Sequence, residues 1–249
     1  MNEIEILEFD TQLFGFKTVR FTGSVLDESK GKEVIKYCRE EKVRCLFANF
    51  SADDFSSLSV ATKQGFIITD IRVDFEKDIS SFVYDKRVPE GYQIDNNVIG
   101  DDNIYLEKLA KQISKVSRFN FDKNFSEGSP DNLYAAWMEN SIKGEQADEL
   151  FIAREAKNKK PVGVITCKNK SDYGKIVLVG VDQQHRGKTI ASCILNEVCR
   201  NFKNNNFKLI KVVASGKNID VLRLYQKNGF FIKSVSIVLH LWLNQEEGT

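Results

Sequence analysis

The stretch that most constrains the fold is residues 175–231, which reads as strand, polar turn, helix, strand, helix, strand. Residues 175–181 (KIVLVGV) are apolar and β-branched, as in a buried strand. Apolar residues recur at helical spacing over residues 190–202, and a second apolar strand is centred on residues 209–213. Residues 218–227 form a further helical segment that ends at an Asn-Gly pair. This order predicts a mixed α/β fold.

The polar turn at residues 183–190 (QQHRGKTI) joins the first strand to the first helix. A glycine-containing turn that leads into a helix directs unpaired backbone N–H groups at one point, where the helix dipole adds positive potential. His185, Arg186 and Lys188 add side chains able to bind phosphate. The turn therefore predicts an anion site for a phosphorylated ligand.

Two known motifs compete for this turn. A P-loop would end in Gly-Lys-Thr as here, but it needs glycine where this chain has Asp182. Residues 184–189 (QHRGKT) instead resemble the pyrophosphate loop Q/R-x-x-G-x-G/A of the GNAT acyltransferases, with Thr189 in place of the final Gly or Ala. Asn218 and the run 224–230 (LYQKNGF) resemble a second conserved segment of that family. The resemblance implies the GNAT fold and acetyl-CoA as cosubstrate, without a metal.

The resemblance also implies roles for individual residues. Tyr225 would protonate the thiolate that leaves, and strand backbone amides at 178–181 would stabilise the oxyanion, with Gly180 easing the splay of the strand. Alternatively, Tyr225 is a core residue and Asn218 a simple helix cap. The residues expected to bind the cofactor are Leu178, Val179, Val181, Gln184, His185, Arg186, Gly187, Lys188, Thr189, Asn218 and Tyr225.

The composition of the 249 residues excludes several function classes. Lys and Arg total 36 against 35 for Asp and Glu, so no global field favours nucleic acid or membranes. No apolar run is long enough to span a bilayer, and the acidic start MNEIEILEFD has no signal-peptide core. Five scattered cysteines and only two histidines make disulfides and a histidine-rich metal site unexpected. We therefore expect a cytoplasmic protein.

The N-terminal third is predicted to be a smaller α/β subdomain (residues 1–86) before an acetyltransferase domain (residues 87–249), with a turn at residues 88–91 between them. Residues 61–68 (ATKQGFII) echo residues 225–232 (YQKNGFFI), which suggests a partial GNAT repeat. This copy would lack both the helix after the glycine loop and the tyrosine. Alternatively, any helix–glycine–strand unit has this appearance.

The remaining segments are assigned from periodicity and turn residues. We expect helices at 32–40, 53–63, 101–116 and 130–142, and strands at 4–9, 17–21, 43–47, 66–75, 92–94, 150–154, 162–168 and from 230 onward.

The loop at residues 117–130 (SRFNFDKNFSEGSP) is the predicted acceptor site. Arg118 lies between aromatic positions and would bind an anion, while core packing is the alternative for the aromatic residues. From this loop through residue 243 the chain resembles the acetyltransferases that modify the 4-amino group of nucleotide-linked 4-amino-6-deoxy sugars. The resemblance implies an acceptor site that includes Arg118, Phe121 and Tyr134.

Several functional alternatives remain open from the sequence. The acceptor could be another amine (of an antibiotic, a polyamine or a protein), or the chain could be a non-catalytic acyl-CoA-binding module. Asp122, Glu127 and Glu139 are candidate general bases, as is a water chain. An exposed last strand at residues 234–243 could pair across a homodimer.

Overall fold

The computed structural model describes residues 2–100 and 102–244, and its ten strands form one mixed sheet in the order β1-β2-β3-β10-β4-β9-β8-β7-β6-β5. The strands are β1 (Ile4–Ile6), β2 (Thr18–Phe21), β3 (Cys45–Ser51), β4 (Ile67–Asp78), β5 (Tyr92–Asp95), β6 (Glu149–Glu155), β7 (Pro161–Asn169), β8 (Gly174–Val181), β9 (Leu209–Ser215) and β10 (Phe231–Trp242).

The helices are α1 (Glu8–Phe14), α2 (Glu28–Glu40), α3 (Phe55–Lys63), α4 (Asp102–Ser114), α5 (Arg118–Phe121), α6 (Ser129–Ile142), α7 (Ile190–Asn204) and α8 (Ile219–Lys227), with a 3₁₀ turn, η1, at Gln183–His185. The mixed α/β class is confirmed. Asp101, where α4 was expected to begin, lies outside the described residues.

Two segments differ from the sequence prediction. The strand expected over residues 4–9 ends at Ile6, and helix α1 follows, closed by Gly15 at φ +74°. The apolar residues of α1 pack into the aromatic cluster around Phe119 and Phe125, and this tertiary packing overrides a strand-like alternation. The second difference is the short helix α5 inside the loop predicted at residues 117–130.

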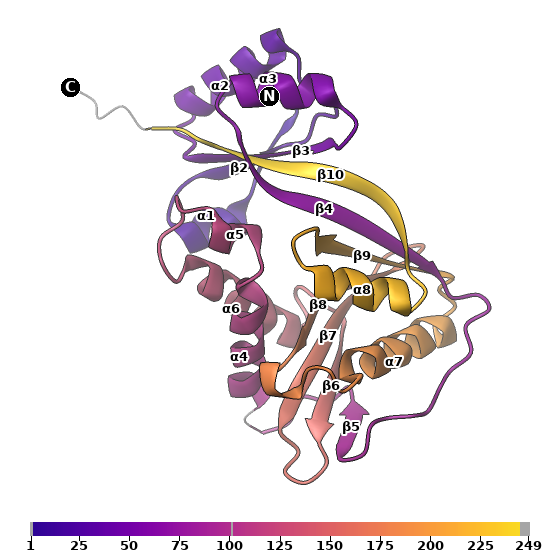
Figure 1. Ribbon diagram of the computed structural model, residues 1–249. Coiled ribbons are helices and arrows are strands. Elements are labelled where there is room, and N and C mark those ends of the chain that lie inside the picture. Colours follow the sequence, from indigo (N-terminus) through magenta and orange to yellow (C-terminus); the bar gives the residue numbers. More distant parts are fainter. Residues whose placement is uncertain (1, 101, 245–249) are drawn as a thin grey trace.

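The long strands β4 and β10 lie side by side in the middle of the sheet, as Figure 1 shows. They are exchanged between the two halves of the chain, because β10 joins the N-terminal strands and β4 joins the C-terminal strands. Strand β4 lies between β9 and β10, and β10 lies between β3 and β4, all in antiparallel pairs. The parallel pairs β2–β3 and β8–β9 flank this centre. The order strand, helix, strand, helix, strand therefore occurs twice, once from β2 to β4 and once from β8 to β10.

Helix α2 lies between β2 and β3 as α7 lies between β8 and β9, but α2 does not follow a glycine loop of the kind at Gln184–Thr189. The two helices also differ at their N-termini. The Asp27 side chain caps α2 by accepting a hydrogen bond from the Lys30 amide at 2.8 Å. This carboxylate would repel an anion at α2.

Strand β10 cannot pair across a dimer as the sequence suggested. One edge of β10 pairs with β3 over Ser236–Trp242 and the other pairs with β4 over Phe231–His240. Both edges are therefore occupied within the chain.

Helices cover the two faces of the sheet unequally. Helices α7 and α8 pack on β6–β9 from one face, and α2 and α3 pack on β2, β3 and β10. On the opposite face, α4 and α6 cover β6–β8, while α1 and α5 cover part of β3 and the end of β10. The middle of this second face, over β3, β10, β4 and β9, is left open between the helices.

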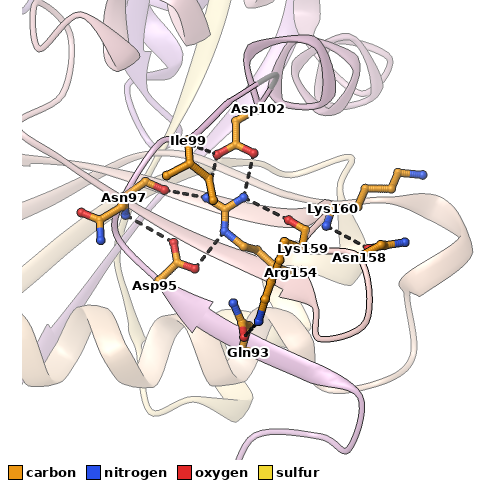
Figure 2. A network of polar contacts seen from close by, with 9 residues as sticks. All are labelled: Gln93, Asp95, Asn97, Ile99, Asp102, Arg154, Asn158, Lys159 and Lys160. Atoms are coloured by element: carbon orange, nitrogen blue, oxygen red, sulfur yellow. Dashed lines mark hydrogen bonds and ion pairs between the residues drawn. The ribbon is translucent and has the colours of Figure 1, made fainter.

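A buried arginine fixes the base of α4 (Figure 2). The Arg154 side chain, on β6, is 0% exposed, and its Nη1 and Nη2 each donate to Asp102 at 2.7 Å. Its Nε donates to Asp95 at 2.8 Å, and further bonds reach the carbonyl oxygens of Asn97 and Lys159. This network joins the β5–α4 connection to the β6–β7 hairpin, and so orients α4 along the sheet.

Candidate active site

The sheet opens between β8 and β9. These parallel strands pair at two positions only, Gly174 with Ile210 and Lys175 with Lys211. The β7–β8 register shifts between Ile176 and Leu178, which leaves Val177 as a bulge. From this point β8 follows β7 while β9 follows β4, and a wedge-shaped opening separates them.

Alternation along β8 determines which backbone amides face the opening. The Asp182 amide donates to the Val162 carbonyl at 2.8 Å and the Leu178 amide to the Thr166 Oγ1 at 3.1 Å, both toward β7. Because successive residues point their N–H groups to opposite edges, the amides of Val179 and Val181 face the opening. The Leu178 amide, one of the expected oxyanion donors, is thus already engaged.

Gly180 has a different role from the one expected. A Cβ atom at this position would lie 2.7 Å from the Ile113 Cδ1 on α4. The glycine therefore allows α4 to pack closely on β8, whereas the splay begins at the bulge.

The turn between β8 and α7 leaves the helix N-terminus free of side-chain caps. Thr189 occupies the N-cap position in the left-handed region (φ 58°), and its hydroxyl bonds the Lys188 carbonyl instead. The first helical bond runs from the Cys193 amide to the Thr189 carbonyl, so the three preceding amides have no partner in the helix. Gly187 has φ +78°, with open space where a Cβ would lie. This turn can approach an anion with its backbone.

The side chains of this turn divide into two groups. His185 lies between Asp182 and Glu155, each 3.3 Å from a ring nitrogen, and its side chain is only 11% exposed. It helps to hold the turn on β6. Arg186 and Lys188 are exposed, with the Arg186 Nε bonded to the Val181 carbonyl and the Lys188 Nζ to the Tyr92 hydroxyl.

Asp182, the residue that excludes a P-loop, anchors the turn to α4. Its Oδ2 accepts from the Gln112 side chain at 3.0 Å, and its Oδ1 accepts from the Gln184 amide at 3.0 Å. Burial alone would raise the pKa of Asp182, but these bonds and His185 hold it below the ordinary value. Nothing in the sequence pointed to Gln112.

A cleft of about 480 Å³ extends from the β8–β9 opening onto the open face of the sheet. Among the predicted site residues, those that line it are Leu178, Val179, Asn218, Tyr225, Arg118 and Tyr134. Phe121 does not line it; this ring is half exposed and lies 4.6 Å from the Lys217 Nζ. The sequence missed the wall contributed by the N-terminal half, namely Arg20, Phe47, Ala48, Asn49, Asp70 and Arg72.

Tyr225 lies at the inner end of this cleft. The residue is 2% exposed, and its ring packs against Phe75 and Phe230 with centroids 5.4 and 5.3 Å away. Burial, with Cys167 nearby, raises the pKa of Tyr225 well above its ordinary value, so the phenol keeps its proton. Asn218 both lines the cleft and caps α8 by accepting from the Val221 amide at 3.3 Å.

Arg118 lies in the cleft without an anionic partner. Its guanidinium stacks on Phe119 and Phe47, 4.3 and 5.1 Å from their centroids. The Nε atom is fully buried without a hydrogen bond, and within the described residues no ion pair reaches this side chain. Desolvation by burial lowers the pKa of Arg118, against the attraction of Tyr134, Asp10 and Asp70.

Asp122 follows helix α5, which carries Arg118, and fixes the end of this helix to β10. Its Oδ2 accepts from the Trp242 Nε1 at 2.9 Å and lies 2.7 Å from the His240 Nδ1. These bonds lower the pKa of Asp122 although its burial opposes them. Desolvation lowers the pKa of His240 to about 4, so the ring is neutral at pH 7. Asp122 is thus an anchor for α5.

Two further observations concern metal sites and membrane-spanning helices. No group of three or more His, Cys, Asp and Glu residues suited to a metal ion occurs in the described part of the chain. Within the same residues, no helix combines the length and apolarity needed to cross a membrane.

Three comparisons with known proteins show what this chain resembles. Residues 111–230 match the model of the acetyltransferase (GNAT) family. A GCN5-related N-acetyltransferase from Sphaerobacter thermophilus superimposes with a TM-score of 0.69 at 14% identity, over 96% of this chain and 76% of that one. A tandem GNAT protein from the clavulanic acid biosynthesis pathway superimposes with a TM-score of 0.62 at 12% identity, over 90% and 75%.

Among curated proteins, the spore coat polysaccharide biosynthesis protein SpsD of Bacillus subtilis is 23% identical over 163 residues. The match covers 66% of this chain and spans 55% of the length of SpsD. The family match includes the β8–β9 opening, the turn at Gln184–Thr189 and Tyr225. Residues 111–230 therefore match a GNAT acetyltransferase domain, and the chain has the GNAT fold.

Proposed function

We propose that this enzyme transfers the acetyl group of acetyl-CoA to the amine of a nucleotide-activated amino-deoxy sugar, of the dTDP-4-amino-4,6-dideoxyhexose (dTDP-fucosamine) type, for surface polysaccharide synthesis. GNAT acetyltransferases generally use acetyl-CoA, and the residues present fit it. The turn at Gly187 and the first amides of α7 would hold the pyrophosphate. The amides of Val179 and Val181 would bind the pantetheine arm and the thioester carbonyl.

The observation that carries the acceptor class is Arg118. A cation that is stacked on two phenylalanine rings and has no carboxylate partner is costly to bury unless a ligand supplies the anion. The diphosphate of a nucleotide sugar supplies this anion in a form that a guanidinium can bind through two parallel bonds. The polysaccharide role printed for SpsD supports a sugar acceptor. The five free cysteines fit a cytoplasmic setting, where thiols stay reduced.

Tyr225 supplies the proton for the sulfur in this proposal. Its raised pKa means that the phenol is a weak acid, so its contribution begins as a hydrogen bond to the developing thiolate. Proton transfer follows as the carbon–sulfur bond breaks. The amide of Val179 faces the opening, where negative charge develops on the carbonyl oxygen.

The test of the acceptor is a rate comparison. Release of free thiol from acetyl-CoA is measured with a panel of dTDP- and UDP-linked amino sugars, free amino sugars, polyamines, aminoglycosides and peptide amines. The proposal predicts the highest kcat/KM for a dTDP-linked 4-amino sugar. A free amine that is turned over equally well without a nucleotide would contradict it.

The test of Tyr225 is its replacement by phenylalanine, which keeps the ring packing against Phe75 and Phe230. General acid catalysis is worth about 10²–10⁴-fold, so kcat of Tyr225→Phe should fall within that range. The affinity for acetyl-CoA should be retained. A kcat close to that of the wild type would remove the role.

A further inference from the structure

Asp70 lies on the wall of the cleft because β4 is exchanged between the two halves. On β4 it stands opposite Val238 of β10, and it is 9% exposed. We propose that Asp70 is the general base that accepts a proton from the acceptor amine. The inference rests on the proposed amine acetylation and adds to it a catalytic group supplied by the N-terminal half.

Only one oxygen of the Asp70 carboxylate accepts hydrogen bonds from the described residues. Its Oδ1 accepts hydrogen bonds from the Ser215 Oγ at 2.6 Å and from the Ile71 amide at 2.8 Å. Within the described residues no hydrogen bond reaches Oδ2, and Oδ2 is not among the fully buried atoms that lack a partner. Asp70 therefore has one fixed oxygen and one oxygen available to a ligand in the cleft.

Ser215 connects Asp70 to the cofactor opening. It is the last residue of β9, three positions before Asn218, and both line the cleft. A group bound beside the β8–β9 opening would thus lie in the same cleft as the available oxygen of Asp70. This is the arrangement that a base needs with respect to an attacking amine.

No other acidic residue lines the cleft within the described part of the chain, and no histidine does. The three candidates from the sequence lie elsewhere. Asp122 bonds His240 and Trp242, Glu139 pairs with Lys143 on the surface of α6, and Glu127 is exposed outside the cleft lining. Asp70 is accordingly the one carboxylate there that can take a proton directly.

Other charged and titratable groups face the same cleft. A pH profile of the transfer reports on all of them, so an amide replacement is needed to isolate Asp70. These groups are Arg20 on β2, Arg72 on β4, Arg118 on α5, Tyr134 on α6, Lys175 on β8 and Tyr225 on α8.

The transfer releases one proton for each amine that is acetylated. The acceptor arrives as an ammonium ion and gives one proton to Asp70, so that the nitrogen lone pair can form the bond to the thioester carbon. The carbon–sulfur bond breaks with its electron pair on sulfur, which takes the proton of Tyr225. The second proton lost by the nitrogen replaces that of Tyr225, and the first passes from Asp70 to solvent. The products are the amide, free CoA thiol and one proton.

The first test is Asp70→Asn. The amide oxygen can still accept from Ser215 and from the Ile71 amide, so the fold and the affinity for acetyl-CoA should remain. The rate kcat should fall by about 10²–10⁴-fold. Asp53→Asn, an exposed site in the turn before α3, is the matched control and should keep the wild-type rate.

The second test is chemical rescue. In Asp70→Ala, added formate should restore part of kcat, an effect that a merely structural carboxylate would not produce. Rates are compared on the panel amine that the wild type acetylates fastest. If that amine carries no nucleotide, the proposed acceptor is wrong while the result for Asp70 stands. A kcat for Asp70→Asn within about threefold of the wild type, or no rescue by formate, would overturn the role.

Discussion

Two buried or partly buried arginines in this molecule have opposite surroundings. Arg154 uses all three guanidinium nitrogens on two carboxylates and two carbonyl oxygens, and its side chain is 0% exposed (Figure 2). Arg118 stacks on two phenylalanine rings, and within the described residues its guanidinium has no hydrogen bond or ion pair. Arg154, on β6, bonds Asp102 at the start of α4, and Arg118 is the first residue of α5.

The difference separates a structural charge from one that awaits a ligand. Desolvation of a guanidinium is costly, and Arg154 recovers the cost within the fold. Among the described residues, no group of the fold fully offsets the desolvation of Arg118, and burial lowers the pKa of Arg118. In contrast, the hydrogen bonds to Asp102 raise the pKa of Arg154. Removing each charge should therefore affect different properties of the protein.

The largest expected effect on stability comes from Arg154→Met. The change leaves the carboxylate of Asp102, whose side chain is 6% exposed, without its partner. Removing one member of a buried pair typically costs about 3–5 kcal/mol, which we expect as the loss in free energy of unfolding by urea. Arg87→Met is the control, because Arg87 pairs with Asp85 while its side chain is 90% exposed, and its loss should change stability little.

The next effect concerns the anchor below Arg118. The folded-state pKa of His240, about 4, is lower than its ordinary value of 6.5, so the unfolded chain binds more protons between these values. The stabilisation is complete above about pH 6.5 and is lost as the pH falls to about 4, a change of roughly 3 kcal/mol. Urea unfolding as a function of pH measures it. His240→Asn keeps a donor for Asp122 and should flatten this pH dependence, and an equally steep profile in the variant would contradict the assignment.

Local patterns in the sequence predicted the strand–turn–helix units in which the proposed cofactor residues lie. The spacing from the apolar strand to Gly187 and Thr189, and from Asn218 to Tyr225, lies within contiguous strand–helix units. Backbone geometry at such junctions follows from nearby residues, so the uncapped start of α7 and the shared cleft of Asn218 and Tyr225 could be anticipated.

The acceptor side could not be predicted in the same way. Asp70, Arg72 and Asn49 reach the cleft because β4 and β10 are exchanged between the two halves, and no local pattern encodes this pairing. The same exchange places β10 in the middle of the sheet, where the sequence suggested an exposed strand. Arg118 was identified because an arginine among aromatic residues is chemically unusual, whereas the absence of a partner depends on the tertiary structure.

The central claim is that Arg118 binds an anionic group of the acceptor, and titration of dTDP by calorimetry tests it most directly. Wild-type enzyme should bind dTDP, and Arg118→Met should lose about 1.5–3 kcal/mol, or about 10- to 150-fold in Kd, as for a charged hydrogen bond. The free energy of unfolding of Arg118→Met should be unchanged or higher, since a charge without a partner is removed. Equal dTDP affinity in the two proteins, or destabilisation as large as that of Arg154→Met, would contradict the account.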